Sequence, residues 1–517
     1  MVFEVRYTDL AARIGRLETP HGVVETPAFV PVVHPVRQTI SPSFLRKKMG
    51  FDLVITNAYI TLRQYGDEAR RRGIHDIIGF DGAVMTDSGG YQVLEYGSVE
   101  VQPADMAQFE KDIKSDIPIP LDKPTGYGLP YEKAKEYVRM TLENCRETLK
   151  VVGDTDAVWV GPMQGAEHYD LVEHSAATLD AMGFQLMAIG SPVEVMEAYE
   201  FATLARMIAR AKKVIPAKPI HLFGAGHPLT IPLAIATGCD TFDSASYMLY
   251  AKDDRYMLPS GTVRLADLTY LPCQCPVCSS FRVNELRALA KDEKTVEVAK
   301  HNLHVLKAEV DACKQAIMDG RLWEYVVQKA RAHPKLWEAV QLFGSDDDFA
   351  FLADNTPAFK ERAIFFFDAI DQHRPEAKRF RAMASSSFTS AKKKKAVLFP
   401  EGEVHPFYAT KGFKALARKF PDAQLCTYNP FLGVIPAEIS DVFPASHNLT
   451  ARLERKAEDY PTFVESLASF ASGNNNNFDE IIIVAADDFV RQAAVLAKLK
   501  NCRVEDYSDH VIDRLSF

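Results

Sequence analysis

Residues 156–191 read DAVWVGPMQGAEHYDLVEHSAATLDAMGFQLMAIGS, and this stretch decides the predicted fold. Its first part, DAVWVGPMQG (156–165), is a short apolar run that ends on polar residues and glycine, as a buried strand does. DLVEHSAATLDAMG (170–183) then carries apolar residues at helical spacing, and FQLMAIGS (184–191) is a second short apolar run. The stretch therefore predicts a strand, a helix and a second strand, which is the repeating unit of a parallel sheet.

The same alternation continues on both sides of this stretch. Before it, FDLVIT (51–56) precedes the helical pattern TLRQYGDEARRRG (61–73), and after it a long helical pattern (193–215) precedes PIHLFG (219–224). Repeated strand–helix units with chemically active residues at the strand ends favour a (β/α)₈ TIM barrel, which we expect over residues 1–345. An open doubly wound α/β sheet is the alternative.

The chain changes character after the last of these units. Residues 264–345 contain a cysteine-rich loop followed by helical segments, which predicts an inserted zinc subdomain at about 270–305 and closing helices. ASSSFTSAKKKK (384–395) is small, polar and then basic, so we expect residues 346–395 to form a helical connector and linker. Apolar runs and helical patterns resume afterwards and predict a smaller α/β accessory domain over residues 396–517.

Composition limits the classes of protein that fit. The chain has 517 residues, of which 47% are hydrophobic and 25% charged, as in globular proteins of several domains. No apolar run approaches the length of a membrane span and the N-terminus has no leader pattern, so we expect a cytoplasmic protein. The formal net charge of −9 gives no sign of nucleic-acid binding, although it leaves room for a local basic patch.

Three of the eight cysteines lie close together, at Cys273, Cys275 and Cys278. In a cytoplasmic protein such a cluster indicates a metal site rather than disulfides. One tight turn would bring all three thiolates to a tetrahedral zinc ion, and His301 or His304 on the following helical segment would supply the fourth ligand. We therefore expect one structural Zn²⁺ per chain in a Cys₃His site.

Two aspartates stand out by their setting at predicted strand ends. Asp87 follows the apolar AVMT and precedes Ser88, and Asp243 follows CDTF and precedes Ser244. In a barrel both would project into the mouth, where one carboxylate could act as a nucleophile and the other as an acid/base. Breaking and remaking a glycosidic bond requires such a pair. Taken alone, each Asp-Ser also fits a helix N-cap, so the surrounding sequence must decide.

A series of motifs resembles those of tRNA-guanine transglycosylases, in the same order along the chain. They are TPHGVVETPAFVPV (19–32), LVITNAY (53–59), MTDSGGYQV (85–93), PLDKPT (120–125), MQG (163–165), AIGSPVEVME (188–197), HLFGAGHP (221–228), GCDTFDSASYMLYAKDDRYM (238–257), LPCQCPVC (271–278) and KHNL (300–303). The resemblance covers roughly residues 5–345. It implies a (β/α)₈ barrel with an inserted zinc subdomain.

The resemblance also implies roles for individual residues. Asp243 of FDSASY matches the family's nucleophile toward the ribose anomeric carbon, and Asp87 of TDSGGYQ matches its general acid/base, although the order of these two roles stays open. Asp122 of PLDKPT matches the carboxylate that accepts hydrogen bonds from the base. Gln164 matches a donor to the base carbonyl, and His301 of KHNL matches the zinc ligand.

The expected base pocket includes further residues. Gly190, with its neighbours Ala188 and Ser191, matches backbone that lines the pocket, and Ser88 completes the expected substrate-binding set. A carboxylate opposite two donors and an amide opposite an acceptor suit the edge of guanine. The 7-deazaguanines share that edge, so one pocket would hold the leaving and the incoming base in turn.

The resemblance to the archaeal branch implies a specific glycosyltransferase reaction. YMLYAKDDRYM (247–257) and LPCQCPVCS (271–279) are similar to enzymes that replace guanine at position 15 of the tRNA D arm by 7-cyano-7-deazaguanine (preQ0), in archaeosine biosynthesis. The expected partners are tRNA, the two bases and a second copy of the chain. Because nothing after residue 397 resembles the PUA module of archaeal enzymes, we also expect a separately encoded PUA-domain protein.

Other functions fit the same pattern less well. Related barrels insert 7-deazaguanines into DNA, and some transglycosylases have non-catalytic partner subunits that bind tRNA. The full motifs around Asp87, Asp122, Gln164 and Asp243 argue against a non-catalytic subunit. A downstream archaeosine-forming paralogue is disfavoured because its cysteine-containing signature is missing.

Overall fold

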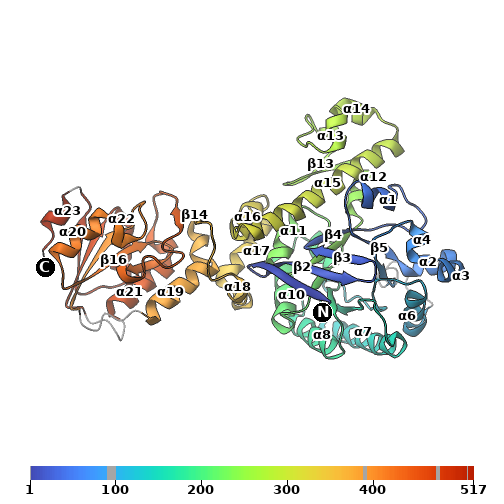
Figure 1. Ribbon diagram of the computed structural model, residues 1–517, viewed down its shortest axis with the longest axis horizontal. Coiled ribbons are helices and arrows are strands. Elements are labelled where there is room, and N and C mark those ends of the chain that lie inside the picture. The colour runs from blue at the N-terminus through green and yellow to red at the C-terminus, as the bar shows by residue number, and fades with distance from the viewer. Residues whose placement is uncertain (1, 90–100, 388–392, 473–477, 509, 517) are drawn as a thin grey trace. The chain divides into compact units, whose positions relative to one another are not determined.

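The structure is a computed structural model that describes residues 2–89, 101–387, 393–472, 478–508 and 510–516. Contacts between residues divide the chain into two compact units, which are both mixed α/β (Figure 1). The first unit comprises Met1–Leu342 with Asp347–Phe351, and the second comprises Phe343–Asp346 with Leu352–Phe517.

Parallel strands form the centre of the first unit. They are β4 (Ala28–Pro31), β5 (Leu53–Asn57), β6 (Ala83–Asp87), β7 (Ile117–Pro118), β8 (Val160–Met163), β9 (Leu186–Ile189), β10 (Ile220–Leu222) and β11 (Thr241–Ser244). One sheet has the order β4-β11-β10-β9-β8 and the other the order β5-β6-β7. Each is parallel throughout. Inward-facing residues such as Val30, Ile55 and Leu186 join in one hydrophobic cluster.

Helices follow these strands along the chain and cover them. They are α1 (Pro42–Lys47), α2 (Ala58–Tyr65), α3 (Asp67–Arg72), α4 (Ile74–Ile78), α6 (Pro103–Asp112), α7 (Tyr131–Val152), α8 (Tyr169–Ala181), α9 (Pro192–Glu197), α10 (Phe201–Val214), α11 (Thr230–Thr237) and α12 (Ser246–Lys252). In α10 the buried residues Leu204, Ile208 and Ala211 recur at helical spacing, which explains how this helix packs on the strands.

Two of the expected helices are divided in the structure. The pattern at 61–73 contains Gly66, whose φ of +48° ends α2 and starts α3, because glycine takes this conformation at little cost. The pattern at 193–215 breaks between α9 and α10, where Tyr199 has a φ of +59°. The strand–helix alternation predicted from the sequence is otherwise confirmed.

A three-stranded antiparallel sheet precedes the parallel strands and was not expected. Its strands are β1 (Phe3–Asp9), β2 (Ala12–Thr19) and β3 (Gly22–Thr26), in that order. Leu17 and Val24 from this sheet pack into the same cluster as the parallel strands. The sheet therefore covers part of the core of the first unit.

After β11 the chain forms a hairpin and a series of helices. These are β12 (Arg255–Leu258), β13 (Gly261–Arg264), α13 (Pro276–Ser280), α14 (Val283–Ala288), α15 (Lys291–Met318), α16 (Leu322–Ala330) and α17 (Pro334–Ser345). Figure 1 shows β13, α13 and α14 projecting beyond the long helix α15. The cysteine-rich loop lies in this projecting part.

The second unit has its own five-stranded sheet. Its strands are β15 (Lys395–Pro400), β16 (Ala423–Asn429), β17 (Gly433–Pro436), β19 (Glu480–Ala485) and β20 (Cys502–Asp506), in the order β17-β16-β15-β19-β20. Only β17 is antiparallel to its neighbour among these strands of the described chain. A separate parallel pair joins β14 (Ile364–Phe366) and β18 (Asn448–Thr450).

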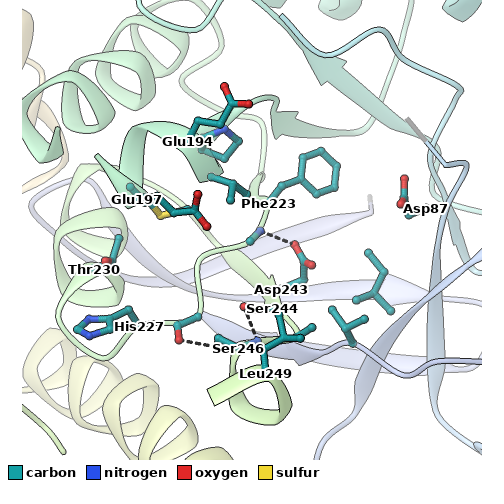
Figure 2. A pocket seen from close by; sticks show the side chains of 18 of the residues that line it. Asp87, Glu194, Glu197, Phe223, His227, Thr230, Asp243, Ser244, Ser246 and Leu249 are labelled. Atoms are coloured by element: carbon teal, nitrogen blue, oxygen red, sulfur yellow. Dashed lines mark hydrogen bonds between the residues drawn. The ribbon is translucent and has the colours of Figure 1, made fainter. Parts of the chain in front are cut away.

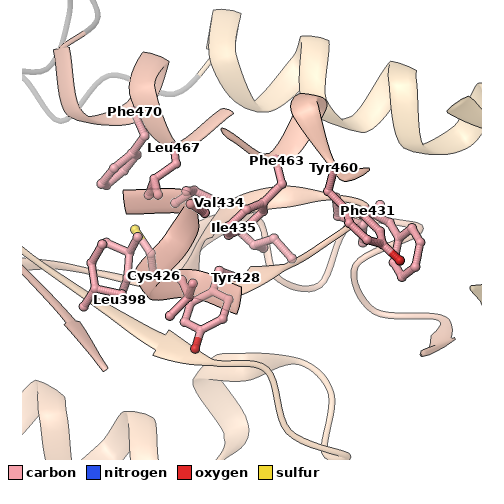
Figure 3. Close-up of a cluster of buried hydrophobic side chains, with 14 of the residues drawn as sticks. Leu398, Cys426, Tyr428, Phe431, Val434, Ile435, Tyr460, Phe463, Leu467 and Phe470 are labelled. Atoms are coloured by element: carbon pink, nitrogen blue, oxygen red, sulfur yellow. The ribbon is translucent and has the colours of Figure 1, made fainter. Parts of the chain in front are cut away.

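Helices cover both faces of this sheet. On one face α19 (Pro375–Ser387), α21 (Pro461–Ser472) and α22 (Asp488–Leu496) pack against a cluster that includes Leu398 and Ile483 (Figure 3). On the other, α20 (Lys411–Lys419) and α23 (Val511–Arg514) pack with Val397 and Ile482. Neighbouring residues of β15 and β19 thus point to opposite faces, as a strand requires.

The structure differs from the expected connector at 346–395. Residues 352–387 pack within the second unit, with α18 (Leu352–Asn355), β14 and α19 among them. Residues 384–387, expected at the start of the linker, are the last turn of α19. Ala377 and Phe380 anchor that helix in the cluster, so it can continue through small polar residues. Residues 388–392 of the expected linker lie outside the described residues.

Candidate active site

A cavity of about 840 Å³ opens at the carboxyl ends of the parallel strands (Figure 2). Asn57 and Asp87 are the last residues of β5 and β6, and Asp243 lies near the end of β11. All three line the cavity, together with Asp122, Gly190 and Ser191. Five of the residues singled out from the sequence, from four separate segments, therefore meet in one place.

Asp243 is held by two donors on the same oxygen. Its Oδ1 accepts hydrogen bonds from the Gly224 backbone N–H at 3.0 Å and from His221 Nε2 at 3.1 Å. His221 is fully buried, and its Nδ1 lies 2.9 Å from the Thr241 hydroxyl. Because a carboxylate only accepts, the ring proton lies on Nε2 and Nδ1 accepts from Thr241. Within the described chain both donors go to Oδ1, which leaves Oδ2 for a substrate.

Asp87 is held by neutral donors. Asn57 Nδ2 donates to Asp87 Oδ2 at 3.1 Å, and the Gly89 N–H donates to Oδ1 at 3.2 Å. Burial, with a contribution from the negative charge of Asp243, raises the pKa of Asp87 to about 6, although both hydrogen bonds act in the other direction. A carboxyl group with a pKa near neutrality can give and take protons at physiological pH.

Asp122 forms a connected pair with Gln164. Gln164 Nε2 donates to Asp122 Oδ2 at 2.6 Å, while Gln164 Oε1 accepts from Thr125 N–H and from the Ser191 hydroxyl, both at 3.0 Å. Burial first, and then the charge of Asp87, raises the pKa of Asp122 to about 7. The amide is nearly inaccessible, so it orients the carboxylate that lines the cavity.

The loop after β9 closes around this pair. A Cβ at Gly190 would overlap the Gln164 amide, so only glycine fits there. Ser191 has a φ of +58°, a strained conformation that directs its hydroxyl to Gln164. Ala188 is fully buried in the hydrophobic cluster behind the cavity. Ser88 is also buried, and its hydroxyl has no hydrogen-bond partner among the described residues.

Some residues of this site were missed in the sequence. Asn57 ends an apolar run just as Asp87 does, so the same rule would have found it. His221 and Thr241 lie inside strands, and only the pairing of β10 with β11 brings them together. The end of the MTDSGGYQV motif, residues 90–93, lies outside the described residues.

The four predicted metal ligands also meet. Cys273, Cys275, Cys278 and His301 form one group whose ligand atoms lie within 4.8 Å of one another. Cys275 Sγ lies 3.5 Å from Cys278 Sγ, and His301 Nδ1 lies 3.3 Å from Cys278 Sγ. Ligands around a tetrahedral zinc ion lie about 3.5 to 3.7 Å apart, so the group fits such an ion.

A second contact orients His301. Its Nε2 donates to the Met257 carbonyl at 2.8 Å, which leaves Nδ1 free to face the cysteines. The Tyr256 ring stacks on His301 with a centroid distance of 3.6 Å. The group could therefore bind a metal ion through His301, and not through the alternative, His304.

The chain matches one protein family. The sequence model of the family described as queuine tRNA-ribosyltransferase matches residues 9–335. These residues include most of the cavity lining and the Cys₃His group. The match covers more than half of the chain, so the chain belongs to this family of transferases.

Curated relatives extend the similarity into the second unit. The tRNA-guanine(15) transglycosylase of Aeropyrum pernix is 40% identical over 450 residues, which are 86% of this chain and 86% of the relative. That of Pyrobaculum aerophilum is 37% identical over 492 residues, which are 94% and 96% of the two chains. That of Sulfolobus acidocaldarius is 37% identical over 446 residues, or 86% and 87%.

Membrane insertion finds no support in the helices. Among the described residues, every helix is too short or too polar to span a lipid bilayer.

Proposed function

We propose that this chain is a transglycosylase that exchanges guanine at position 15 of the tRNA D arm for 7-cyano-7-deazaguanine, in archaeosine biosynthesis. The observation that carries the proposal is the meeting of Asp87, Asp243 and the Asp122–Gln164 pair in one cavity. The names of the archaeal relatives support tRNA guanine 15 as the site of exchange. The incoming base follows from the resemblance of the motifs to the archaeal branch.

The first half of the reaction forms a covalent intermediate. Asp243 Oδ2 attacks the anomeric carbon of the ribose, the glycosidic bond breaks, and its electron pair leaves with guanine. Asp87, protonated in part because of its raised pKa, gives a proton to the departing base. His221 and Gly224 hold the other oxygen of Asp243 and so fix the direction of attack.

The second half reverses these steps with the incoming base. Asp87, now ionised, takes a proton from the nitrogen of 7-cyano-7-deazaguanine that attacks the anomeric carbon, and the bond to Asp243 breaks. Two inversions give net retention. The reaction succeeds only if water is kept from the intermediate, which suits a cavity enclosed by strands and their loops.

Base recognition falls to Asp122. As a carboxylate it accepts hydrogen bonds from the two neighbouring donors on the guanine edge, and Gln164 holds it in position. The family resemblance implies a direct hydrogen bond from Gln164 to the base carbonyl, which its second amide N–H would donate. Gly190 gives the base and the amide room to approach.

The barrel and the zinc subdomain belong to the same proposal. Two links between the parallel sheets support closure into a (β/α)₈ barrel: the bridge between Val32 and Ile55, and the hydrogen bond from Val158 N–H to the Asp116 carbonyl at 2.8 Å.

We propose that Cys273, Cys275, Cys278 and His301 hold one structural Zn²⁺, which would join the loop to α15. Dimerisation stays a prediction.

Metal analysis tests the zinc site. The purified chain should contain about one zinc ion, as one Cys₃His set implies. His301→Ala should lose it, whereas His304→Ala, one helical turn away, should keep it. Chelation should lower stability before it affects exchange, because protein ligands fill all four positions. A stable, active chain without zinc would contradict the structural role.

Nucleoside analysis tests the exchange itself. The chain is incubated with 7-cyano-7-deazaguanine and either tRNA or duplex DNA, and the nucleosides are analysed by mass spectrometry. We expect one new nucleoside in tRNA, at position 15, and none in DNA. Incorporation into DNA alone would indicate the related DNA-modifying activity. Tight tRNA binding without incorporation would indicate a non-catalytic subunit.

A further inference from the structure

A second group of metal-ligating side chains lies at the opposite end of the parallel strands from the cavity. His21, His75 and Asp116 offer ligand atoms that lie within 4.8 Å of one another. Asp116 comes directly before β7, at the amino end of the strands, whereas the cavity opens at their carboxyl ends. These three described residues are absent from the lining of the cavity. The group is therefore separate from the proposed exchange chemistry.

The three side chains come from three different segments of the first unit. His21 lies in the turn between β2 and β3 of the antiparallel sheet, and His75 is the second residue of α4. Asp116 is tied to the neighbouring strand β6, because its Oδ2 accepts a hydrogen bond from the Val84 N–H at 2.7 Å. An ion held by all three side chains would join the antiparallel sheet, α4 and the parallel strands.

Asp116 is the centre of the group. Its side chain is fully buried, with His21 Nδ1 at 2.6 Å from Oδ1 and His75 Nε2 at 2.8 Å from Oδ2. In the part of the chain that the structure describes, these two histidines, and no lysine or arginine, form ion-pair contacts with Asp116. A buried carboxylate costs free energy unless a positive charge compensates it. Neutral imidazoles supply donors but no charge, so a cation between them would complete the group.

The three ligand types suit zinc. Imidazole nitrogens and carboxylate oxygens bind Zn²⁺ at about 2.0 to 2.2 Å, so ligand atoms around a tetrahedral ion lie about 3.3 Å apart. The rings of His21 and His75 stack at a centroid distance of 3.7 Å, which brings two nitrogen ligands side by side. The contacts to Asp116 would have to lengthen by roughly half an ångström. The His21 side chain is 43% exposed in its turn, so it has room for this shift.

The same side chains also make a hydrogen-bonded group without a metal. In that arrangement each imidazole donates one N–H to Asp116, because a carboxylate only accepts. An ion replaces both of these protons, and each ring then carries its proton on the other nitrogen. The two arrangements respond differently to His21→Asn, since asparagine keeps a neutral donor beside Asp116 but is a poor ligand for zinc.

We propose that His21, His75 and Asp116 bind one divalent transition-metal ion, with Zn²⁺ as its probe, in addition to the ion of the Cys₃His site. The ion is structural, because it lies at the amino ends of the strands, away from the reacting groups. Three protein ligands and an exposed edge bind less tightly than a closed set of four. The chain therefore keeps about one zinc ion through purification and takes up a second when zinc is supplied. This proposal does not depend on the proposed base exchange.

Zinc titration of the full chain tests the second site. The Cys₃His site is first filled, and bound metal is then measured after equilibrium dialysis over a range of free zinc concentrations. The wild type should bind a second equivalent, whereas His21→Asn and His75→Ala should stay at one. His174→Ala is the matched control, because His174 is an exposed histidine on α8 outside the group, and this variant should still bind two. Circular dichroism shows whether each variant is folded.

Thermal unfolding distinguishes a metal site from a hydrogen-bonded group. With free zinc about 100-fold above the Kd of the second site, the midpoint should rise by about 2 to 5 °C in the wild type and in His174→Ala. In His21→Asn the rise should be less than about 1 °C. Without added zinc the wild type and His21→Asn should unfold at nearly the same temperature, because both keep a neutral donor to Asp116.

Two results would overturn the second site. One is a folded wild-type chain that stays at one equivalent of zinc throughout the titration. The other is a second equivalent that both His21→Asn and His75→Ala retain, because the ion would then lie elsewhere. Anomalous scattering at the zinc edge, from crystals of the zinc-loaded chain, locates the ion directly. A peak between His21, His75 and Asp116 is expected, and a second zinc peak found only at other residues would contradict the proposal.

Discussion

Asp87 and Asp122 of the first unit and Glu376 of the second unit are all buried carboxylates, but their surroundings are opposite. In the first unit, Asp87 and Asp122 accept hydrogen bonds from neutral amides, and burial raises the pKa of Asp87 to about 6 and that of Asp122 to about 7. In the second unit, Glu376 lies 2.5 Å from Lys360 Nζ and 3.2 Å from Arg374 Nε. Burial alone would raise the pKa of Glu376, but these two charges outweigh it and hold the pKa well below its usual range.

This contrast distinguishes buried carboxylates that suit a reaction from buried carboxylates that suit a structural role. A carboxylate without a neighbouring cation changes its charge readily near neutral pH, which suits proton transfer and base recognition. One between two cations keeps its charge, which suits the fixed joining of segments. Acidity at a buried site therefore depends on its partners, and those partners support the proposed proton transfer by Asp87 and a structural role for Glu376.

The largest effect is expected at Asp87. Asp87→Asn removes the proton donor and acceptor while keeping the shape, and should lower the exchange rate about 10²- to 10⁴-fold. Stability should be unchanged or higher, because a buried carboxyl with a raised pKa costs free energy when ionised. Steady-state exchange, tRNA binding and thermal unfolding measure the three quantities. Full exchange in Asp87→Asn would remove Asp87 from the mechanism.

The opposite result is expected at Glu376. Glu376→Gln removes the anion that two buried cations face, and should lower the free energy of unfolding by about 3 to 5 kcal/mol. Exchange per folded molecule should stay unchanged. Glu338→Gln is the control, since Glu338 pairs with Lys335 at the surface and should change stability by less than about 0.5 kcal/mol. If Glu376→Gln and Glu338→Gln lowered the free energy of unfolding equally in denaturant, the buried cluster would add no stability beyond that of a surface pair.

A smaller and pH-dependent effect is expected at Asp122. Its pKa of about 7 means that it is mostly protonated below pH 7 and mostly ionised above it. Only the ionised form accepts two donors from the base, so KM for the free base should rise about tenfold per unit as pH falls below 7. Asp122→Asn should have a high KM that does not depend on pH over this range. The same slope in the variant would assign the titration to another group.

The sequence predicts the positions of active residues better than their partners. Asp87 and Asp243 were found because each follows a short apolar run, and both lie at strand ends in one cavity. The Cys₃His group was found from spacing, and the geometry favours His301 over His304. The local sequence pattern is therefore sufficient to find a candidate residue where a reactive side chain lies at the end of a strand.

Partners from distant segments could not be predicted in this way. His221 reaches Asp243 only through the register of β10 and β11, and a buried histidine inside a strand looks like a core residue. Lys360 and Arg374 lie in the stretch 346–395, which was expected to be a helical connector and linker because residues 384–395 are small, polar and then basic. They are buried because they surround Glu376, an arrangement that hydropathy cannot reveal.

Mapping the covalent adduct tests the central claim most directly. Excess enzyme is mixed with tRNA without incoming base, quenched in denaturant and digested, and the peptide that carries ribose is identified by mass spectrometry. We predict that the adduct lies on Asp243, whose Oδ2 is available to the substrate, and that Asp243→Asn forms none while still binding tRNA. An adduct on Asp87, or an undiminished adduct in Asp243→Asn, would contradict the account.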